Sequence, residues 1–389
     1  MRTSIFKFRS VAICTIFLAF LFFNQCTKTS DQVRVIGCIT ALTGSDANYG
    51  RSTRQGVDLA VEQVNAELKE NGKQYYYQIV YEDDEMSPQQ GPGAYQKLTT
   101  VNHVPLIIGP FGSRVVLAVA PLAEAGHTVL VSASATSDKI ADAGDYIFRT
   151  VPMNKQQAKD CATFAFNKLG YKKAFILYVN DTYGVTLQTA FKEYFVQLGG
   201  AVIGEDAYEK DATNFRTQLT RIKTLKPDFV FFPGYYKEPA LILKQAADIG
   251  IQDLGIKFIG TDGSCTDDLI RIAGDAAEGS FYSNLAVDFE GDDPEMQQFL
   301  SAFKTKYQID PDAYATYYYD TFKMLAQVLA PVKWNSAKPL ETAERIKTAL
   351  YNMAPYKGIT GTIQFDDKGE VSKSFAIMQV VKGKFVPTK

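Results

Sequence analysis

The stretch between residues 106 and 136 constrains the fold of this chain more than any other. It contains an apolar strand, a tight loop, a helix-length run with apolar residues at helical spacing, a second strand and a small polar loop. The tight loop is Gly109–Gly112, the helix follows at Ser113, and the polar loop is Ser134–Thr136. Gly and Pro interrupt regular structure, and a Ser before an apolar-periodic run is typical of a helix N-cap. The stretch therefore predicts a strand–helix–strand unit with parallel strands.

Both loops of this unit fall at the same edge of the predicted sheet. The carboxyl ends of parallel strands meet at one edge, where open α/β folds bind their ligands. Free N–H groups and partial positive charge at a helix N-terminus favour an anion beside Ser113. Ser134, Ala135 and Thr136 are short enough to let a ligand reach the backbone. We therefore predict a site for a carboxylate or phosphate here; the alternative for Ser113 is a plain N-cap without ligand contact.

The same alternation of strands and helices runs through most of the chain. It fills residues 33–132 and restarts after Pro152, as far as about residue 273. Short extended segments near residues 149, 281 and 358 separate the two blocks. This pattern predicts an α/β fold with two doubly wound parallel-sheet lobes, joined by three hinge strands with a cleft between them.

The crossing points set the predicted domain boundaries. The first lobe is expected to contain residues 32–149 and 282–357, and the second lobe residues 150–281 and 358–389. Residues 358–365 and 375–381 are expected to form a closing hairpin around a turn rich in Asp and Gly.

The first 26 residues are typical of an export signal. Three basic residues precede the apolar run 11–23, which is short for a membrane span and suits a signal-peptide core. Cys26 follows, as in the cleavage site of a bacterial lipoprotein. We predict a lipoprotein signal peptide at residues 1–25, lipidation of Cys26, a linker at 26–31, and an exported protein held on a membrane by its lipid. An ordinary signal peptide or uncleaved anchor is the alternative, because Asn24-Gln25 replaces the usual small residues.

Composition excludes several classes of function. The chain has 389 residues, of which 46% are hydrophobic and 22% charged, as in a globular protein. Its 41 basic residues against 43 acidic ones give no reason to expect a nucleic-acid partner. Two His and five Cys leave little material for a metal centre, so we expect no metal and no cofactor. Asp83 and Asp84 are adjacent in a strand and face opposite sides, which argues against a shared catalytic site.

Several short motifs resemble a known family in their order and spacing. They are Leu42-Thr43-Gly44 with Asn48-Tyr49-Gly50, Ile108-Gly109 with Ser113, Ser134-Ala135-Thr136, Phe148-Arg149, Asp181-Thr182-Tyr183-Gly184, Phe232-Pro233-Gly234-Tyr235, Gly260-Thr261-Asp262 and Tyr319-Asp320. Over nearly all of the mature chain, the sequence resembles a type I periplasmic binding protein of the Leu/Ile/Val-binding kind, the substrate-binding subunit of an ABC importer. The resemblance implies a solute-binding protein rather than an enzyme, acting as a monomer that hands an amino acid to permease subunits in the membrane.

The same resemblance implies roles for individual residues. Ser113 and Thr136, with backbone groups of Ser134 and Ala135, would hold the ligand carboxylate, and Asp262 with Thr136 would hold the ammonium. The aromatic residues that would line the pocket are Tyr49, Phe111, Tyr183, Tyr235 and Tyr314. A zwitterion held by one lobe at each end would favour the closed state. The alternative for Asp262 is a turn residue, and for the tyrosines plain packing.

The sequence departs from the family pattern around the expected side-chain pocket. Met86 and Gly112 lie where some relatives have Cys residues, and Tyr314 replaces a group that is often less polar. The ligand expected is therefore a branched-chain or related small amino acid, or an amide. A sensory or regulatory lipoprotein of the same fold, without a dedicated transporter, is the alternative function.

Overall fold

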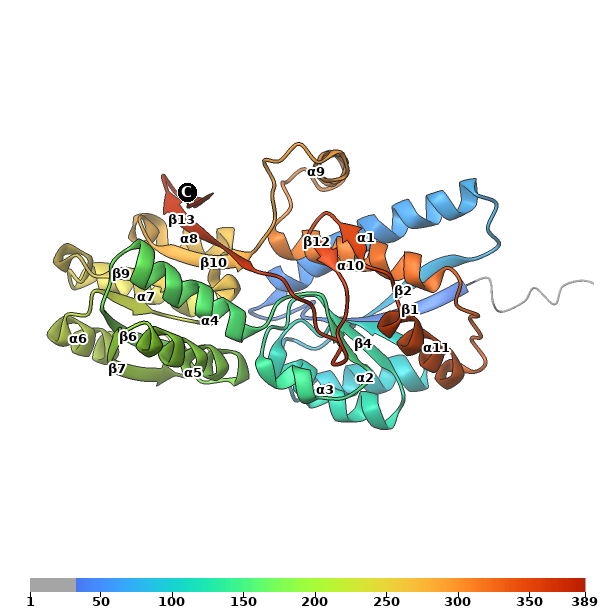
Figure 1. The fold of residues 1–389 in the computed structure, drawn as a ribbon, viewed down its shortest axis with the longest axis horizontal. Helices are drawn as coiled ribbons and strands as arrows, with labels where there is room; N and C mark the ends of the chain where they lie inside the picture. The colour runs from blue at the N-terminus through green and yellow to red at the C-terminus, as the bar shows by residue number, and fades with distance from the viewer. Residues whose placement is uncertain (1–32, 389) are drawn as a thin grey trace, which may run out of the picture.

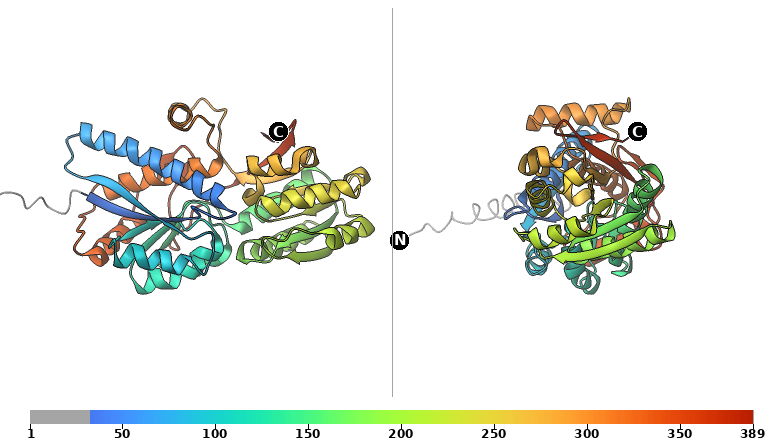
Figure 2. Two further views of the ribbon diagram at one scale, coloured as in Figure 1. Left: turned by 180° about the vertical axis from the view of Figure 1, so that it is seen from behind. Right: turned by 90° about the vertical axis from the view of Figure 1, so that its left-hand side faces the viewer.

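The computed structural model describes residues 33–388, so the predicted signal peptide, Cys26 and the linker lie outside the described residues. The chain forms two lobes side by side along the long axis of the molecule (Figure 1). Each lobe is a largely parallel sheet covered by helices, and the view from behind shows the same division (Figure 2). This architecture confirms the predicted α/β fold with two doubly wound lobes.

The first lobe is built on a five-stranded parallel sheet. Its strand order is β2-β1-β3-β4-β5, and the strands are β1 (Val33–Thr40), β2 (Tyr76–Asp83), β3 (Leu106–Ile108), β4 (Val129–Ser132) and β5 (Ile147–Arg149). Helices α1 (Ala47–Glu70) and α10 (Ala313–Leu329) lie on one side, and α2 (Gly91–Thr100) and α3 (Ser113–Ala125) on the other (Figure 1). Helices α9 (Pro294–Tyr307) and α11 (Pro339–Tyr351) complete the lobe. Both faces of the sheet are covered, which explains why β3 and β4 are wholly buried apolar runs.

The second lobe is built on a seven-stranded sheet. Its order is β14-β13-β10-β9-β8-β6-β7, with β6 (Lys173–Val179), β7 (Ala201–Tyr208), β8 (Phe229–Phe231), β9 (Lys257–Gly260), β10 (Phe281–Leu285), β13 (Phe375–Val381) and β14 (Lys384–Pro387). The helices around it are α4 (Asn154–Thr163), α5 (Thr182–Gln197), α6 (Arg216–Leu225), α7 (Lys237–Asp248) and α8 (Asp267–Ala273). The strands from β10 to β7 are parallel, whereas β13 and β14 run antiparallel to their neighbours.

The C-terminal strands pair differently from the prediction, and the expected closing hairpin is wrong. Strand β13 pairs with β10 and then turns back into β14, while β11 (Tyr356–Gly358) and β12 (Gly361–Ile363) form a separate two-stranded sheet. The reason is a buried carboxylate: Asp320 of α10 accepts hydrogen bonds from the N–H groups of Ile359 and Thr360 and so fixes the β11–β12 turn on the first lobe. Residues 282–285, expected in the first lobe, lie in β10 of the second sheet, where β10 pairs with β13 and β9.

Three segments connect the lobes, at residues 150–153, 286–293 and 364–374. The third lies further along the chain than the crossing expected near residue 358. It is tied to β5 by the Arg149 N–H, which donates to the Gly369 carbonyl at 3.0 Å, and by an ion pair between Arg149 and Glu370. The fully buried Arg149 guanidinium also donates to the Ser137 carbonyl at 2.7 Å. One side chain therefore links a connecting segment to the small polar loop of the first lobe.

Candidate ligand-binding cleft

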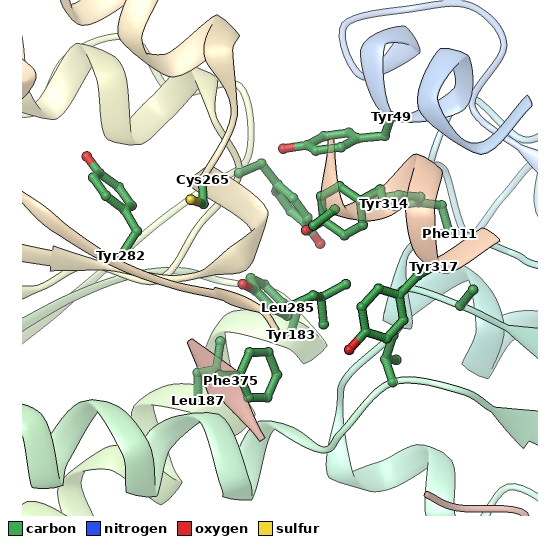
Figure 3. Packing of buried hydrophobic residues seen from close by; sticks show 14 of the residues in the cluster. Tyr49, Phe111, Tyr183, Leu187, Cys265, Tyr282, Leu285, Tyr314, Tyr317 and Phe375 are labelled. Carbon is green, nitrogen blue, oxygen red and sulfur yellow. The ribbon is translucent and has the colours of Figure 1, made fainter. Parts of the chain in front are cut away.

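A small cavity lies between the lobes, at the carboxyl ends of both sheets. Its volume is about 20 Å³, and it is lined by Met86, Phe111, Gly112, Ser113, Ser134, Tyr183, Tyr235, Asp262, Gly263 and Tyr314. Seven of the predicted site residues are in this lining. The other three, Tyr49, Ala135 and Thr136, are buried beside it. Figure 3 shows Tyr49, Phe111 and Tyr314 of the first lobe converging with Tyr183 of the second. The structure thus brings the two sets of predicted residues together from distant parts of the chain.

The helix start of the first lobe differs in detail from the prediction. Gly112, with φ −85° and ψ 137°, is the N-cap of α3, and Ser113 is the first helical residue. The predicted N-cap role of Ser113 is therefore wrong: its Oγ accepts the Ser137 N–H at 3.2 Å. A side chain at residue 112 would press against Met86, whose nearest atom would be 3.2 Å from the added Cβ. Among the described residues no side chain caps α3, which leaves the N–H groups of Ser113 and Arg114 for other partners.

Hydrogen bonds of the Ser134 side chain hold the Ser134–Thr136 loop of the first lobe in place. The Ser134 hydroxyl donates to the Phe111 carbonyl at 2.8 Å and bonds the Tyr318 hydroxyl at 2.8 Å. Ser134 therefore ties the two loops together with its side chain, which leaves only its backbone for a ligand. In contrast, Thr136 is 1% exposed and its Oγ1 has no hydrogen-bond partner in the described part of the chain.

The second lobe contributes a carboxylate surrounded by donors. Asp262 Oδ1 accepts hydrogen bonds from the Tyr183 hydroxyl at 2.6 Å and from Gln157 Nε2 at 2.7 Å. Its Oδ2 accepts from the Tyr314 hydroxyl, which comes from the other lobe, at 3.2 Å. Burial raises the pKa of the Asp262 carboxyl, and these hydrogen bonds oppose that shift by stabilising the ionised form. Such a group is well suited to hold a cation.

Gln157 is a site residue that the sequence did not reveal. It lies inside α4 among other polar residues, without the Gly or small residues that mark a loop at a strand end. The one signal available is that Gln157 falls on the face of α4 shared with the apolar Ala158 and Cys161, all of which are buried. A buried polar residue on such a face has to find hydrogen-bond partners, which here come from the site.

Aromatic rings form one group on each lobe. Tyr49 stacks on Phe111 with centroids 4.8 Å apart, and Tyr314 meets Phe111 edge-on at 4.8 Å. In the second lobe Tyr183 and Tyr235 stack at 5.5 Å. The Tyr235 hydroxyl donates to Asp181 at 2.8 Å, and this hydrogen bond fixes the orientation of the Tyr235 side chain. These rings exclude water from the cavity and strengthen the electrostatic interactions inside it.

Direct contacts between the lobes flank the cavity. The Tyr49 hydroxyl donates to the Gly263 carbonyl and accepts the Tyr236 N–H at 3.1 Å. Lys210 pairs with Asp46 at 2.8 Å, and the Tyr236 hydroxyl donates to the Ser45 carbonyl at 2.6 Å. The structure therefore shows the two lobes closed on one another.

Among residues 33–388, no group of His, Cys, Asp or Glu side chains is arranged to hold a metal ion. Within the same residues, no helix is both long and apolar enough to span a membrane.

Relatives of known structure share this two-lobed arrangement. A leucine-binding protein from Thermotoga maritima superimposes with a TM-score of 0.82 at 24% identity, covering 91% of this chain and 97% of that one. A branched-chain amino acid binding protein from Streptococcus pneumoniae, solved with isoleucine, gives 0.81 at 25%, covering 92% and 100%. A solute-binding protein from Rhodopseudomonas palustris, solved with benzoate, gives 0.78 at 24%, covering 91% and 95%.

Sequence comparison agrees with the structural one. A Leu, Ile, Val, Thr and Ala-binding protein of Pseudomonas aeruginosa is 27% identical over 350 residues, or 90% of each chain. The profile of the periplasmic binding protein family matches residues 35–384. These relatives are extracytoplasmic solute-binding proteins, not enzymes. The chain belongs to the periplasmic binding protein family, as a type I member of the Leu/Ile/Val-binding type.

Proposed function

We propose that this protein captures an amino acid, branched-chain or of related small size, in the cleft and delivers it to an ABC importer. The observation that carries the proposal is Asp262. A buried carboxylate with no cationic partner is costly, and three side chains donate hydrogen bonds that favour its charged form. A ligand ammonium would supply the missing positive charge.

The opposite side of the cavity suits the other end of an amino acid. The uncapped start of α3 beside Ser113, the backbone of Ser134 and Ala135, and the unpartnered Thr136 hydroxyl offer donors to a carboxylate. Hydrogen-bond donors on one side and the Asp262 carboxylate on the other would hold a zwitterion across the closing lobes.

Aromatic acids are the competing ligand class, because relatives from Rhodopseudomonas palustris were solved with benzoate or 4-hydroxybenzoate. Such ligands carry a carboxylate but no ammonium. They would leave the Asp262 charge buried without a counter-ion, at a cost of several kcal/mol. The presence of Asp262 therefore favours an amino acid over an aromatic acid.

The test is a thermal-shift screen followed by calorimetry, since a ligand that binds only the folded protein raises its melting temperature. The panel contains Leu, Ile, Val, Ala and Thr, the 2-hydroxy acid matching each, small amides, benzoate and 4-hydroxybenzoate. We expect binding of at least one amino acid and none of its 2-hydroxy analogue. Binding of benzoate without any amino acid would overturn the proposal.

Delivery and anchoring need experiments in cells. Deletion of the gene should abolish uptake of the radiolabelled ligand, and the wild-type gene should restore it. Unchanged uptake would favour a sensory role instead. Lipidation is tested by fatty-acid labelling of the wild-type protein and of Cys26→Ser, which should take up no label.

A further inference from the structure

The helix that begins the second lobe carries two buried amides that bond to residues lining the cleft. Asn154 and Gln157 lie one turn apart on α4, and both are fully buried. Asn154 bonds to two of the predicted site residues. Its backbone N–H donates to the Thr136 carbonyl at 2.6 Å, and its Nδ2 donates to the Tyr183 carbonyl at 3.0 Å. Gln157 contacts Asp262 directly.

Each amide uses its nitrogen fully and leaves its oxygen free. Gln157 Nε2 donates to Asp262 Oδ1 at 2.7 Å and to Ser283 Oγ at 3.0 Å. The second proton of Asn154 Nδ2 goes to Thr186 Oγ1 at 2.6 Å. Gln157 Oε1 and Asn154 Oδ1, by contrast, have no partner among the described residues. The reverse orientation is disfavoured for both, since each oxygen would then face another acceptor, the Asp262 carboxylate or the Tyr183 carbonyl.

The number of hydrogen bonds that the Asp262 carboxylate can accept limits how many N–H groups of a ligand ammonium it can bind. A carboxylate has about four acceptor positions. Tyr183 and Gln157 occupy both positions of Oδ1, and Tyr314 occupies one of Oδ2. At most one position therefore remains for a ligand. A primary ammonium has three N–H donors, so two of them need acceptors other than Asp262.

We propose that Gln157 Oε1 accepts the second N–H of the ligand ammonium and that Asn154 Oδ1 accepts the third. Gln157 Oε1 lies next to the Asp262 carboxylate because it shares a carbon with the nitrogen bonded there. The subsite then selects primary amines over N-alkylated ones, since an N-methyl ligand leaves a buried acceptor unpaired. This inference rests on the proposed function and assigns Gln157 as a specificity-determining residue.

The experiment is calorimetric titration with two ligands: the tightest-binding of Leu, Ile, Val, Ala and Thr, and the N-methyl derivative of the same amino acid. We expect wild-type protein to bind the N-methyl form about 10- to 100-fold more weakly, as for one lost hydrogen bond to a charged group. In Gln157→Met the ratio between the two affinities should fall about tenfold. The reason is that the acceptor is absent for both ligands.

The ratio of the two affinities distinguishes direct recognition of the ligand by Gln157 from an indirect role in which Gln157 only positions Asp262. If Gln157 only positions the carboxylate, Gln157→Met weakens both ligands equally and the ratio is unchanged, which would overturn the inference. Gln156→Met is the matched control, because Gln156 precedes Gln157 on α4 but bonds Asp160 at 2.8 Å. It should leave both affinities unchanged.

Two further outcomes are distinguishable. If circular dichroism shows that Gln157→Met does not fold, the wild-type protein alone still tests the inference. Equal affinity of the wild-type protein for the amino acid and for its N-methyl form would overturn it. Failure of every amino acid to bind would overturn this inference together with the proposed function. Amino-acid binding with an unchanged ratio would overturn this inference alone.

Discussion

Each lobe buries one carboxylate just beyond the carboxyl end of a parallel strand, but the two are supported very differently. Asp84 follows β2 in the first lobe, and Asp262 follows β9 in the second. Asp84 Oδ1 accepts the Met86 N–H at 2.8 Å, and its Oδ2 has no hydrogen-bond partner in the described chain. Asp262 has three side-chain donors, one of them from the opposite lobe.

The difference shows what a buried carboxylate needs in order to bind a cation. Burial raises the pKa of both groups, since it penalises the charged form. The pKa of Asp84 rises to about 6, as expected for a group with few donors. At Asp262 burial also raises the pKa, but three side-chain donors oppose that shift and favour the ionised form. Position at a strand end alone therefore does not make an acidic residue a ligand contact.

The largest effect is expected from Asp262→Asn. It removes the charge that would pair with the ligand ammonium and should weaken amino-acid binding by about 2–5 kcal/mol. Calorimetry measures the loss, with circular dichroism to verify folding. Asp84→Asn serves as the control and should bind nearly as wild type. Equal losses in the two variants would remove the distinction between the carboxylates.

The second prediction concerns stability at Asp84. Its folded-state pKa of about 6 lies above the ordinary value of 3.8, so protonation favours the folded state. The stabilisation is complete below about pH 3.8 and is lost as the pH rises through about 6, amounting to about 3 kcal/mol. Asp84→Asn should remove this component. The free energy of unfolding of variant and wild type, measured in denaturant between pH 4 and 8, should diverge by that amount; parallel curves would contradict it.

Ser113→Ala tests the first-lobe side of the cleft. We expect ligand affinity to fall by about 1–3 kcal/mol, the range for a lost hydrogen bond to a charged group. The loss should be smaller than for Asp262→Asn, because backbone N–H groups at the start of α3 remain. Calorimetry decides this order. An unchanged affinity would show that only backbone groups hold the carboxylate.

The smallest effect is expected from Tyr49→Phe. It removes the hydroxyl that bonds Gly263 and Tyr236 across the cleft and should weaken binding by about 0.5–1.5 kcal/mol by disfavouring closure. Small-angle scattering with ligand should show a larger open fraction. Tyr81→Phe is the control, because the Tyr81 hydroxyl bonds Asp58 within the first lobe. Equal open fractions in the two variants would argue against a latch at Tyr49.

Much of the fold could be predicted because strand and helix periods are local. Buried parallel strands are continuous apolar runs, so β1, β3 and β6 were recognisable from sequence. The pairing of β13 could not be predicted from the sequence, because residues 375–381 could pair with any free strand edge. The β11–β12 turn, which was expected to join that pairing, is instead held on the first lobe by Asp320, about 40 residues away on α10.

The sequence by itself determined which chemical groups reach the cleft. Ser113 and Thr136 follow neighbouring strands of the first sheet, whose carboxyl ends share an edge, and Asp262 follows a strand end of the second sheet. Tertiary structure alone decided which of their atoms are free. It paired Ser134 with Tyr318, left Thr136 unpartnered, and brought Gln157 and Tyr314 to Asp262 from 105 and 52 residues away. Such pairings depend on the packing of whole helices, which no local pattern of residues records.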